Sequence, residues 1–280
     1  MLISKILEKK FFSYNLVIYL FLLWNAIKLF LINSDPIIQV LNLLISLGIF
    51  FIIEDQKLII KKKKSFSFFL GLVLFSVTII RSFLLSSTED KYYYFNLPFG
   101  IFALIVILKP FNEIFYLRNI FLISLLLPLR RLFFSASVNF LMPLTKYLTW
   151  FFLYMLGVNP ILNDKNLFID GVQVNISEGC AGADNLFFVI STITIYMLIF
   201  RLNHKNNILF ISISSILVSV VINILRNTII ALVVSSNKPY KDYLYHFLHD
   251  SYGSLIFSFI SVTTVSFIYF KLLDKELKNQ

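Results

Sequence analysis

The stretch VQVNISEGCAGADN, residues 172–185, separates a predicted β-strand from a predicted membrane helix. It contains Cys180, the only cysteine of the chain, with a glycine before it at Gly179 and another after it at Gly182. The glycines and polar residues predict a turn. An apolar run over residues 184–200 follows. A single cysteine cannot form an internal disulfide, so Cys180 is either a free thiol with a function or an inert buried side chain.

The composition is that of a membrane protein. Hydrophobic residues make up 58% of the chain and the mean hydropathy is +0.83, whereas about half of a soluble domain is apolar. Apolar runs near the length of about 20 residues that crosses a bilayer recur throughout. We therefore expect an all-α polytopic membrane protein with about eight transmembrane helices. The predicted runs cover residues 11–32, 37–53, 66–86, 97–108, 119–129, 184–200, 208–234 and 253–270.

The net charge of +10 does not indicate nucleic-acid binding, because most lysines and arginines lie in short loops between apolar runs. Such loops set the orientation of membrane helices, and basic loops stay in the cytoplasm. The strongest marker is the run Lys61–Lys64, and the basic tail over residues 271–280 agrees with it. We predict a multi-pass protein of the plasma membrane, surrounded by membrane lipids, with both termini cytoplasmic.

The path of residues 130–157 is ambiguous. A full membrane span in this segment would place later basic loops on the wrong side relative to Lys61–Lys64. Arg130, Arg131, Lys146 and Trp150 suit a helix that lies on the outer face or dips into it. An ordinary spanning helix over residues 138–158 is the alternative. On the first interpretation, residues 1–158 form the N-terminal transmembrane and interfacial region, and residues 159–280 form the catalytic region.

A β-hairpin is predicted directly before the cysteine loop. Two short apolar segments, residues 168–169 and 172–176, flank the pair Asp170-Gly171. Asp-Gly is favoured in two-residue hairpin turns because both positions need a positive φ. We expect this small hairpin to lie outside the membrane.

Three reactive side chains converge on one membrane face in this topology. Cys180 lies four residues before the sixth predicted span, and His249 lies four residues before the eighth. Arg226 lies inside the seventh span, where a charged side chain is costly enough to be a functional candidate. Asn223, one helical turn earlier, could orient Arg226.

These residue types suit acyl-transfer chemistry. A thiolate is the nucleophile, and a thiol with a pKa of about 8.5 needs a cation or a base nearby to become one. A histidine can take the thiol proton and return it to a leaving amine. An arginine can stabilise an oxyanion. His246 is a rival base, and Glu178 could tune the thiol or contact substrate.

The same residues resemble the three signatures of the exosortase/archaeosortase family, in which Cys-Ser/Ala-Gly, Asn-x-x-Arg and His-x-x-x-Gly follow in this order. The matching segments are Cys180-Ala181-Gly182, residues 223–226 and residues 249–253. The resemblance is strongest over residues 157–270. The short chain and its Cys-Ala-Gly variant suggest a cyanobacterial-type branch.

The resemblance implies a membrane-embedded cysteine peptidase or transpeptidase. Its substrates would be exported proteins that end in a short motif, an apolar helix and a basic tail. Cys180 would be the nucleophile, Arg226 the oxyanion stabiliser and His249 the general acid and base. We expect no cofactor, and one cysteine with scattered histidines gives no recognisable metal-ligand spacing.

The sequence leaves two other function classes open. Arg226 could bind an anion midway across the membrane in a small-solute transporter or a component of an export system. An acyl- or glycosyltransferase would act on a lipid-linked substrate without cleaving a peptide.

Overall fold

A computed structural model describes residues 2–32, 35–56, 66–85, 92–108, 117–163, 166–236, 238–249 and 251–278. The chain forms two compact units, Met1–Leu129 and Arg130–Gln280. The predicted cytoplasmic marker Lys61–Lys64 lies outside the described residues. The predicted change from a membrane region to a catalytic region at residue 158 concerns function and stays a prediction.

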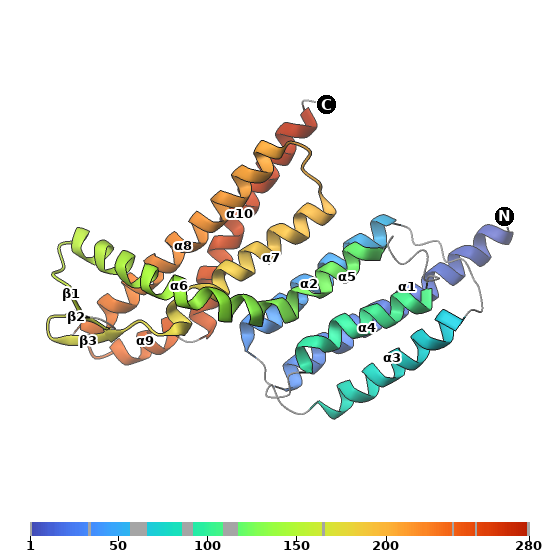
Figure 1. The fold of residues 1–280 in the computed structure, drawn as a ribbon, viewed down its shortest axis with the longest axis horizontal. Helices are drawn as coiled ribbons and strands as arrows, with labels where there is room; N and C mark the ends of the chain where they lie inside the picture. Colours follow the sequence, from blue (N-terminus) through green and yellow to red (C-terminus); the bar gives the residue numbers. More distant parts are fainter. Residues whose placement is uncertain are drawn as a thin grey trace. The chain divides into compact units, whose positions relative to one another are not determined.

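The first unit is helical. Its helices are α1 (Leu2–Leu31), α2 (Pro36–Gln56), α3 (Phe66–Leu84), α4 (Tyr93–Leu108), α5 (Arg118–Ser124) and the first turn of α6 (Leu126–Met155) (Figure 1). α3 lies along α4. The two helices approach closely because Gly71 has no side chain: a Cβ there would lie 2.7 Å from the backbone nitrogen of Ile107 and 3.0 Å from the carbonyl oxygen of Ala103.

A polar network joins four helices of this unit. The amide of Asn25 donates to Asn42 Oδ1 (2.9 Å), and Asn96 Nδ2 donates to Asn25 Oδ1 (2.8 Å) and to Ser82 Oγ (3.3 Å). Trp24 Nε1 also donates to Ser82 Oγ, at 2.9 Å. Polar groups in hydrocarbon need partners within the protein, so these bonds fix how α1 to α4 pack.

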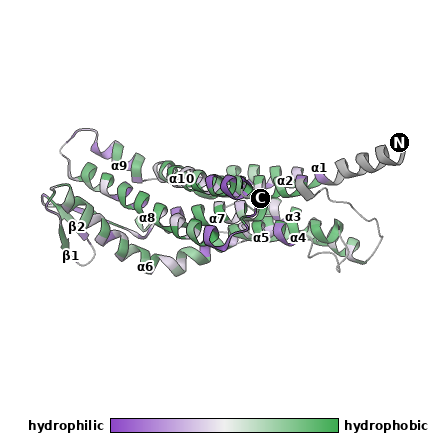
Figure 2. Ribbon diagram, turned by 90° about the horizontal axis from the view of Figure 1, so that it is seen from above, coloured by the Kyte–Doolittle hydropathy of each residue, from purple (hydrophilic) through white to green (hydrophobic). Residues whose placement is uncertain are grey.

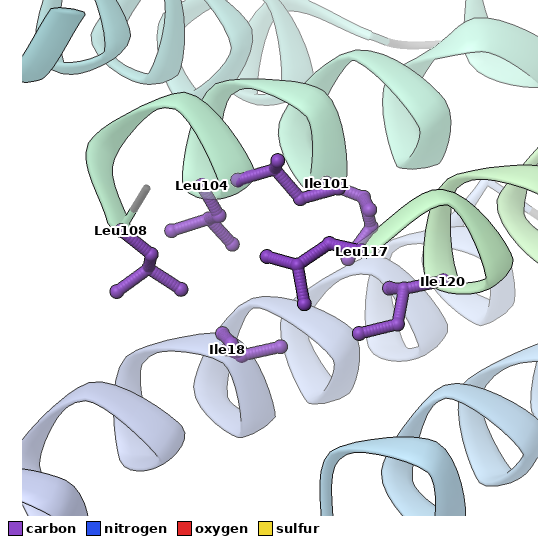
Figure 3. A pocket seen from close by; sticks show the side chains of 7 residues that line it. Ile18, Ile101, Leu104, Leu108, Leu117 and Ile120 are labelled. Atoms are coloured by element: carbon purple, nitrogen blue, oxygen red, sulfur yellow. The ribbon is translucent and has the colours of Figure 1, made fainter. Parts of the chain in front are cut away.

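A small apolar cavity lies between α1, α4 and α5 (Figure 3). Its volume of about 10 Å³ is close to that of a single water-sized sphere. It is lined by Ile18, Ile101, Leu104, Ile105, Leu108, Leu117 and Ile120. The cavity is therefore too small for a substrate and has no polar group to bind one.

The second unit contains the rest of α6, a small sheet and four further helices. The strands are β1 (Ile161–Asn163), β2 (Asn166–Ile169) and β3 (Val172–Asn175), and a short 3₁₀ helix, η2 (Glu178–Cys180), follows them. The helices are α7 (Ala183–Ile199), α8 (Lys205–Ser235), α9 (Lys241–His249) and α10 (Ser251–Lys278). The sheet and α9 lie at one end of this unit, and the C-terminus lies at the other (Figure 1).

Three long helices, α7, α8 and α10, pack against one another. Their shared core contains Val189, Ile193, Ile211, Val265 and Tyr269. Most of α8 has the green colour of apolar residues in Figure 2. A buried carboxylate of α10 caps the start of α8. Glu276 accepts hydrogen bonds from the backbone nitrogens of Asn203 and His204 and from the Asn207 side chain.

The prediction of an all-α polytopic membrane protein is confirmed, but eight spans are not. Within the described part of the chain, five helices are long and apolar enough to cross a bilayer, or six if α5 and α6 form one broken span. The difference lies mainly in the first unit. α4 has only 16 residues, or about 24 Å at 1.5 Å per residue, less than the hydrocarbon thickness of about 30 Å. α5 has seven residues.

The uncertain segment 130–157 is helical almost throughout, as part of α6. Its predicted position on the outer face, and the alternative of a span, concern a bilayer that is not part of the structure, so both stay predictions. Val138 and Leu141 of α6 pack against Ala181, Ala183 and Leu186.

The predicted β-hairpin is confirmed as β2 and β3, which pair antiparallel from Ile169–Val172 to Asn166–Asn175. Asp170 and Gly171 form its turn with φ of 49° and 80°. Two successive positive φ values are those of a type I′ turn, which fits the twist of the strands. β1 adds a third strand beside β2, which the sequence did not predict.

We expect Gly71→Ala to destabilise the first unit, because backbone atoms of α4 leave no room for the added methyl group. Overpacking of this kind typically costs about 1–3 kcal/mol. Thermal unfolding in detergent measures the effect. Ser76→Ala, at an exposed position of the same helix, is the control and should leave the melting temperature unchanged; equal melting temperatures for both variants would contradict the close approach of α3 and α4.

Candidate active site

Cys180 ends η2, between strand β3 and helix α7. The loop is held by its own backbone, since Cys180 N donates to Ser177 O (2.9 Å) and Ala181 N donates to Glu178 O (3.1 Å). The Cys180 side chain is 3% exposed and packs with the inner face of the sheet. The thiol is thus free but enclosed by protein.

Gly182 is required by both conformation and space. Its φ of 84° lies in the left-handed region, where it turns the chain into α7. A Cβ at this position would also lie 2.5 Å from Nδ2 and 2.6 Å from Cγ of Asn223 on α8. The glycine therefore allows the cysteine loop to rest directly on the side chain of Asn223.

Two amides of α8 hold the backbone of the nucleophile. Asn223 Nδ2 and Asn227 Nδ2 both donate to the carbonyl oxygen of Cys180, at 3.0 and 2.9 Å. Thr145 Oγ of α6 donates to the next carbonyl, that of Ala181, at 3.0 Å. The sequence suggested that Asn223 could orient Arg226; in the structure its amide nitrogen is bonded to the cysteine loop instead.

Arg226 lies between the two asparagines and is equally buried, at 3% exposure. Its guanidinium donates from Nε to Leu248 O (3.1 Å) and from Nη2 to His249 O (2.9 Å). These carbonyls belong to the last turn of α9, where a helix has unpaired acceptors and a partial negative charge. The buried cation of α8 therefore fixes the end of the helix that carries His249.

Gly253 brings α10 against the same helix end. A Cβ at Gly253 would lie 2.1 Å from Phe247 O and 2.7 Å from the Cα of Leu248. The two backbones are in contact, so only glycine fits. The spacing between His249 and Gly253 is thus a packing requirement of the turn between α9 and α10.

The structure brings the three predicted side chains together. The His249 imidazole lies within hydrogen-bonding reach of the Cys180 thiol, and the Arg226 charge acts on the same sulfur. Ser177 Oγ lies 3.8 Å from Sγ. The Tyr245 ring stacks on His249 with centroids 4.9 Å apart. This places an imidazole beside the thiol and an aromatic ring against the imidazole.

The other candidates lie elsewhere. His246 is exposed on α9 and contacts the other side of Tyr245. Glu178 is exposed at the start of η2. Across the described residues, no group of three or more His, Cys, Asp or Glu side chains is arranged to hold a metal ion.

Helix α6 supports the cysteine loop from the side opposite α8. Besides the Thr145 contact, Arg130 Nε pairs with Asp184 Oδ1 at 2.9 Å. Asp184 lies in the first turn of α7, where an acidic residue is favourable. The arginine that the sequence suggested for an interfacial helix thus ties α6 to the helix that begins just after Cys180.

A model of the family described as transmembrane exosortase (Exosortase_EpsH) matches residues 31–266, a range that includes Cys180, Arg226 and His249. The chain belongs to the transmembrane exosortase family. The resemblance that the three short motifs predicted is therefore confirmed, and it extends over most of the first unit as well. No curated protein and no solved structure matches the chain.

Several contacts at the candidate site of this exosortase were not expected from the sequence. Asn227 carried a weak signal: it lies one turn after Asn223, as a second amide in an apolar run. Thr145 and Tyr245 carried none, because a hydroxyl or an aromatic ring is ordinary at a helix surface. Their roles depend on contacts between residues far apart in the chain or on the packing around α9.

We expect Asn227→Ala to lower the reactivity of Cys180, because the cysteine loop loses one of its two fixed points on α8. The rate of alkylation of the only cysteine measures this directly, and a decrease of about threefold or more is expected for one hydrogen bond.

Asn207→Ala is the matched control, as it removes an amide of the same helix that bonds to Glu276 instead. It should change the melting temperature but not the alkylation rate. Identical alkylation of the wild type and both variants would show that Asn227 does not position the nucleophile.

Proposed function

We propose that this exosortase is a cysteine peptidase and transpeptidase. Cys180 is the nucleophile, His249 is the general acid and base, and Arg226 both positions His249 and stabilises the oxyanion. The observation that supports it most is that the His249 imidazole reaches the thiol of Cys180 while Arg226 acts on the same sulfur. The thiol, the imidazole and the guanidinium that acyl transfer needs come from three different helices or turns and meet at one site.

In the first step Sγ attacks the carbonyl carbon of the scissile peptide bond, and His249 takes the thiol proton. The C–N bond of the tetrahedral intermediate then breaks, and His249 gives the proton to the leaving amine. A thioester with Cys180 remains. In the second step an acceptor amine, hydroxyl or water attacks the thioester, its proton passes through His249, and Sγ leaves with that proton.

Arg226 has the capacity for two tasks. A guanidinium has five N–H donors, and two are bonded to carbonyls at the end of α9. Those two bonds position His249. The remaining donors are available for the oxyanion of the tetrahedral intermediate, whose stabilisation in a site shielded from water is usually a large part of catalysis.

The substrates that fit are exported proteins with a C-terminal tail made of a short motif, an apolar helix and basic residues. The apolar helix of such a tail would lie in the same bilayer as α8 and α10, which brings the preceding motif to the membrane face. We place the site at the outer face of the plasma membrane, with both termini in the cytoplasm. Two bonds tie the Arg226 guanidinium to the helix that carries His249, which favours the peptidase over an anion transporter.

Cys180→Ala should abolish processing of a co-expressed exported protein with such a tail, while the enzyme stays folded and inserted. His249→Ala should reduce processing at least about a hundredfold, as expected for loss of a general acid and base. His246→Ala is the matched control on the same helix and should retain near-normal activity. Gel mobility of the tailed protein measures processing; full processing by Cys180→Ala would refute the proposal.

The orientation can be tested in the Cys180→Ala background, where the chain has no cysteine left. We expect Lys238→Cys, after α8, to react with a membrane-impermeant maleimide in intact cells. Asn206→Cys, at the start of α8, should react only after the membrane is permeabilised. The reverse pattern would place the candidate site on the cytoplasmic side.

A further inference from the structure

Strand β3 is an edge strand whose outer side has a defined set of unpaired groups. The sheet order is β1-β2-β3, so within the described part of the chain β3 has a neighbouring strand on one side only. In an antiparallel pair, residues alternate between those that bond to the partner strand and those whose N–H and C=O point away. The two-residue turn makes Ile169–Val172 a bonded pair, so Val174 also bonds to β2. Gln173 and Asn175 therefore point their backbone groups outward.

The register on the other side of β2 agrees with this assignment. Phe168 and Asn166, which lie opposite Gln173 and Asn175, pair with Ile161 and Asn163 of β1. Their backbone groups are used there, as the alternation requires. Within the described residues, neither Gln173 nor Asn175 has a hydrogen bond on its outward side.

One face of β3 is exposed. Gln173 and Asn175 are exposed, whereas Val174 and Ile176 are buried against α6 and α8. The contact between β3 and α8 is thus made by the inner face of the strand, where Ala231 packs. Gln173 and Asn175 lie about 7 Å apart along the strand. Each directs one backbone N–H and one C=O away from β2.

The edge leads directly to the nucleophile. Only four residues separate Asn175 from Cys180, and two of them are in the single turn of η2. An extended chain with alternating donors and acceptors is the ligand that such an edge recognises, as in peptide binding by strand addition.

We propose that the segment of the substrate next to the scissile bond adds to β3 as a fourth strand and is bonded by the backbone of Gln173 and Asn175. This inference rests on the proposed peptidase function and names how the same site binds its substrate. The backbone bonds would align the peptide with the site and would not depend on the side chains of Gln173 and Asn175.

The test uses proline at a position where the native fold does not use the N–H. Gln173→Pro removes an outward donor, and proline is tolerated at edge positions whose N–H faces away from the sheet. Gln173→Ala removes the side chain only and is the matched control. The substrate is the tailed protein whose processing depends on Cys180.

We expect Gln173→Pro to reduce processing at limiting substrate by about fivefold to tenfold, the effect of one lost hydrogen bond, through a higher KM at nearly unchanged kcat. Gln173→Ala should stay within about twofold of the wild type. Asn175→Pro and Asn175→Ala repeat the comparison at the second residue. The melting temperature and the rate of Cys180 alkylation should be unchanged in both proline variants, which shows that the hairpin is intact.

Equal processing by the proline and alanine variants would overturn strand addition and leave the peptidase proposal standing. A proline substitution that changed self-association of the enzyme but not processing would also overturn strand addition, since the edge would then pair with a second copy of the chain. If the proline variants lose melting temperature, a backbone N-methyl group introduced at Gln173 by semisynthesis removes the same donor without the ring, and unchanged processing by that protein overturns the proposal. Failure of the wild type to process any tailed protein would instead reject the peptidase function itself.

Discussion

One buried face of α8 holds both halves of the candidate site. Asn223 and Asn227 bind the carbonyl of Cys180, and Arg226, between them, binds the carbonyls at the end of α9. All three are side chains of a single rigid element, so the distance between thiol and imidazole is set by helix geometry. Burying an amide or a guanidinium costs folding free energy unless it is hydrogen-bonded. In this protein the bonds of these groups join the cysteine loop and α9 to α8.

This arrangement gives a physical reason for the glycines of the motifs. Gly182 lets the cysteine loop touch Asn223, and Gly253 lets α10 touch the last turn of α9. Neither glycine contacts the sulfur. Each permits a close backbone approach that brings a candidate catalytic residue to α8. The three short motifs therefore contribute to the same set of contacts, those of the cysteine loop and α9 with α8.

The sequence predicted those features that depend on local chemistry. Asp170-Gly171 predicted a hairpin turn, and the apolar runs predicted membrane helices. Arg226 stood out as a charged side chain inside such a run, and Cys180 and His249 stood out just before two others. It could not predict which acceptors the buried donors would find. The partner of Asn223 is 43 residues earlier in the chain, and Arg226 binds backbone atoms, which leave no trace in a sequence. The predicted count of eight spans was not confirmed, because hydropathy marks apolar residues but not where α4 and α5 end.

The length of α8 bears on the surroundings of the reacting sulfur. Lys205 begins the helix and Arg226 follows 21 residues later, about 32 Å along the axis, close to the thickness of the hydrocarbon layer. A helix perpendicular to the bilayer that started at one boundary would bring Arg226 close to the opposite boundary, where its long side chain can reach toward the headgroups. In the proposed reaction, a thioester formed at that depth would lie within reach of amphiphilic acceptors anchored in the lipid.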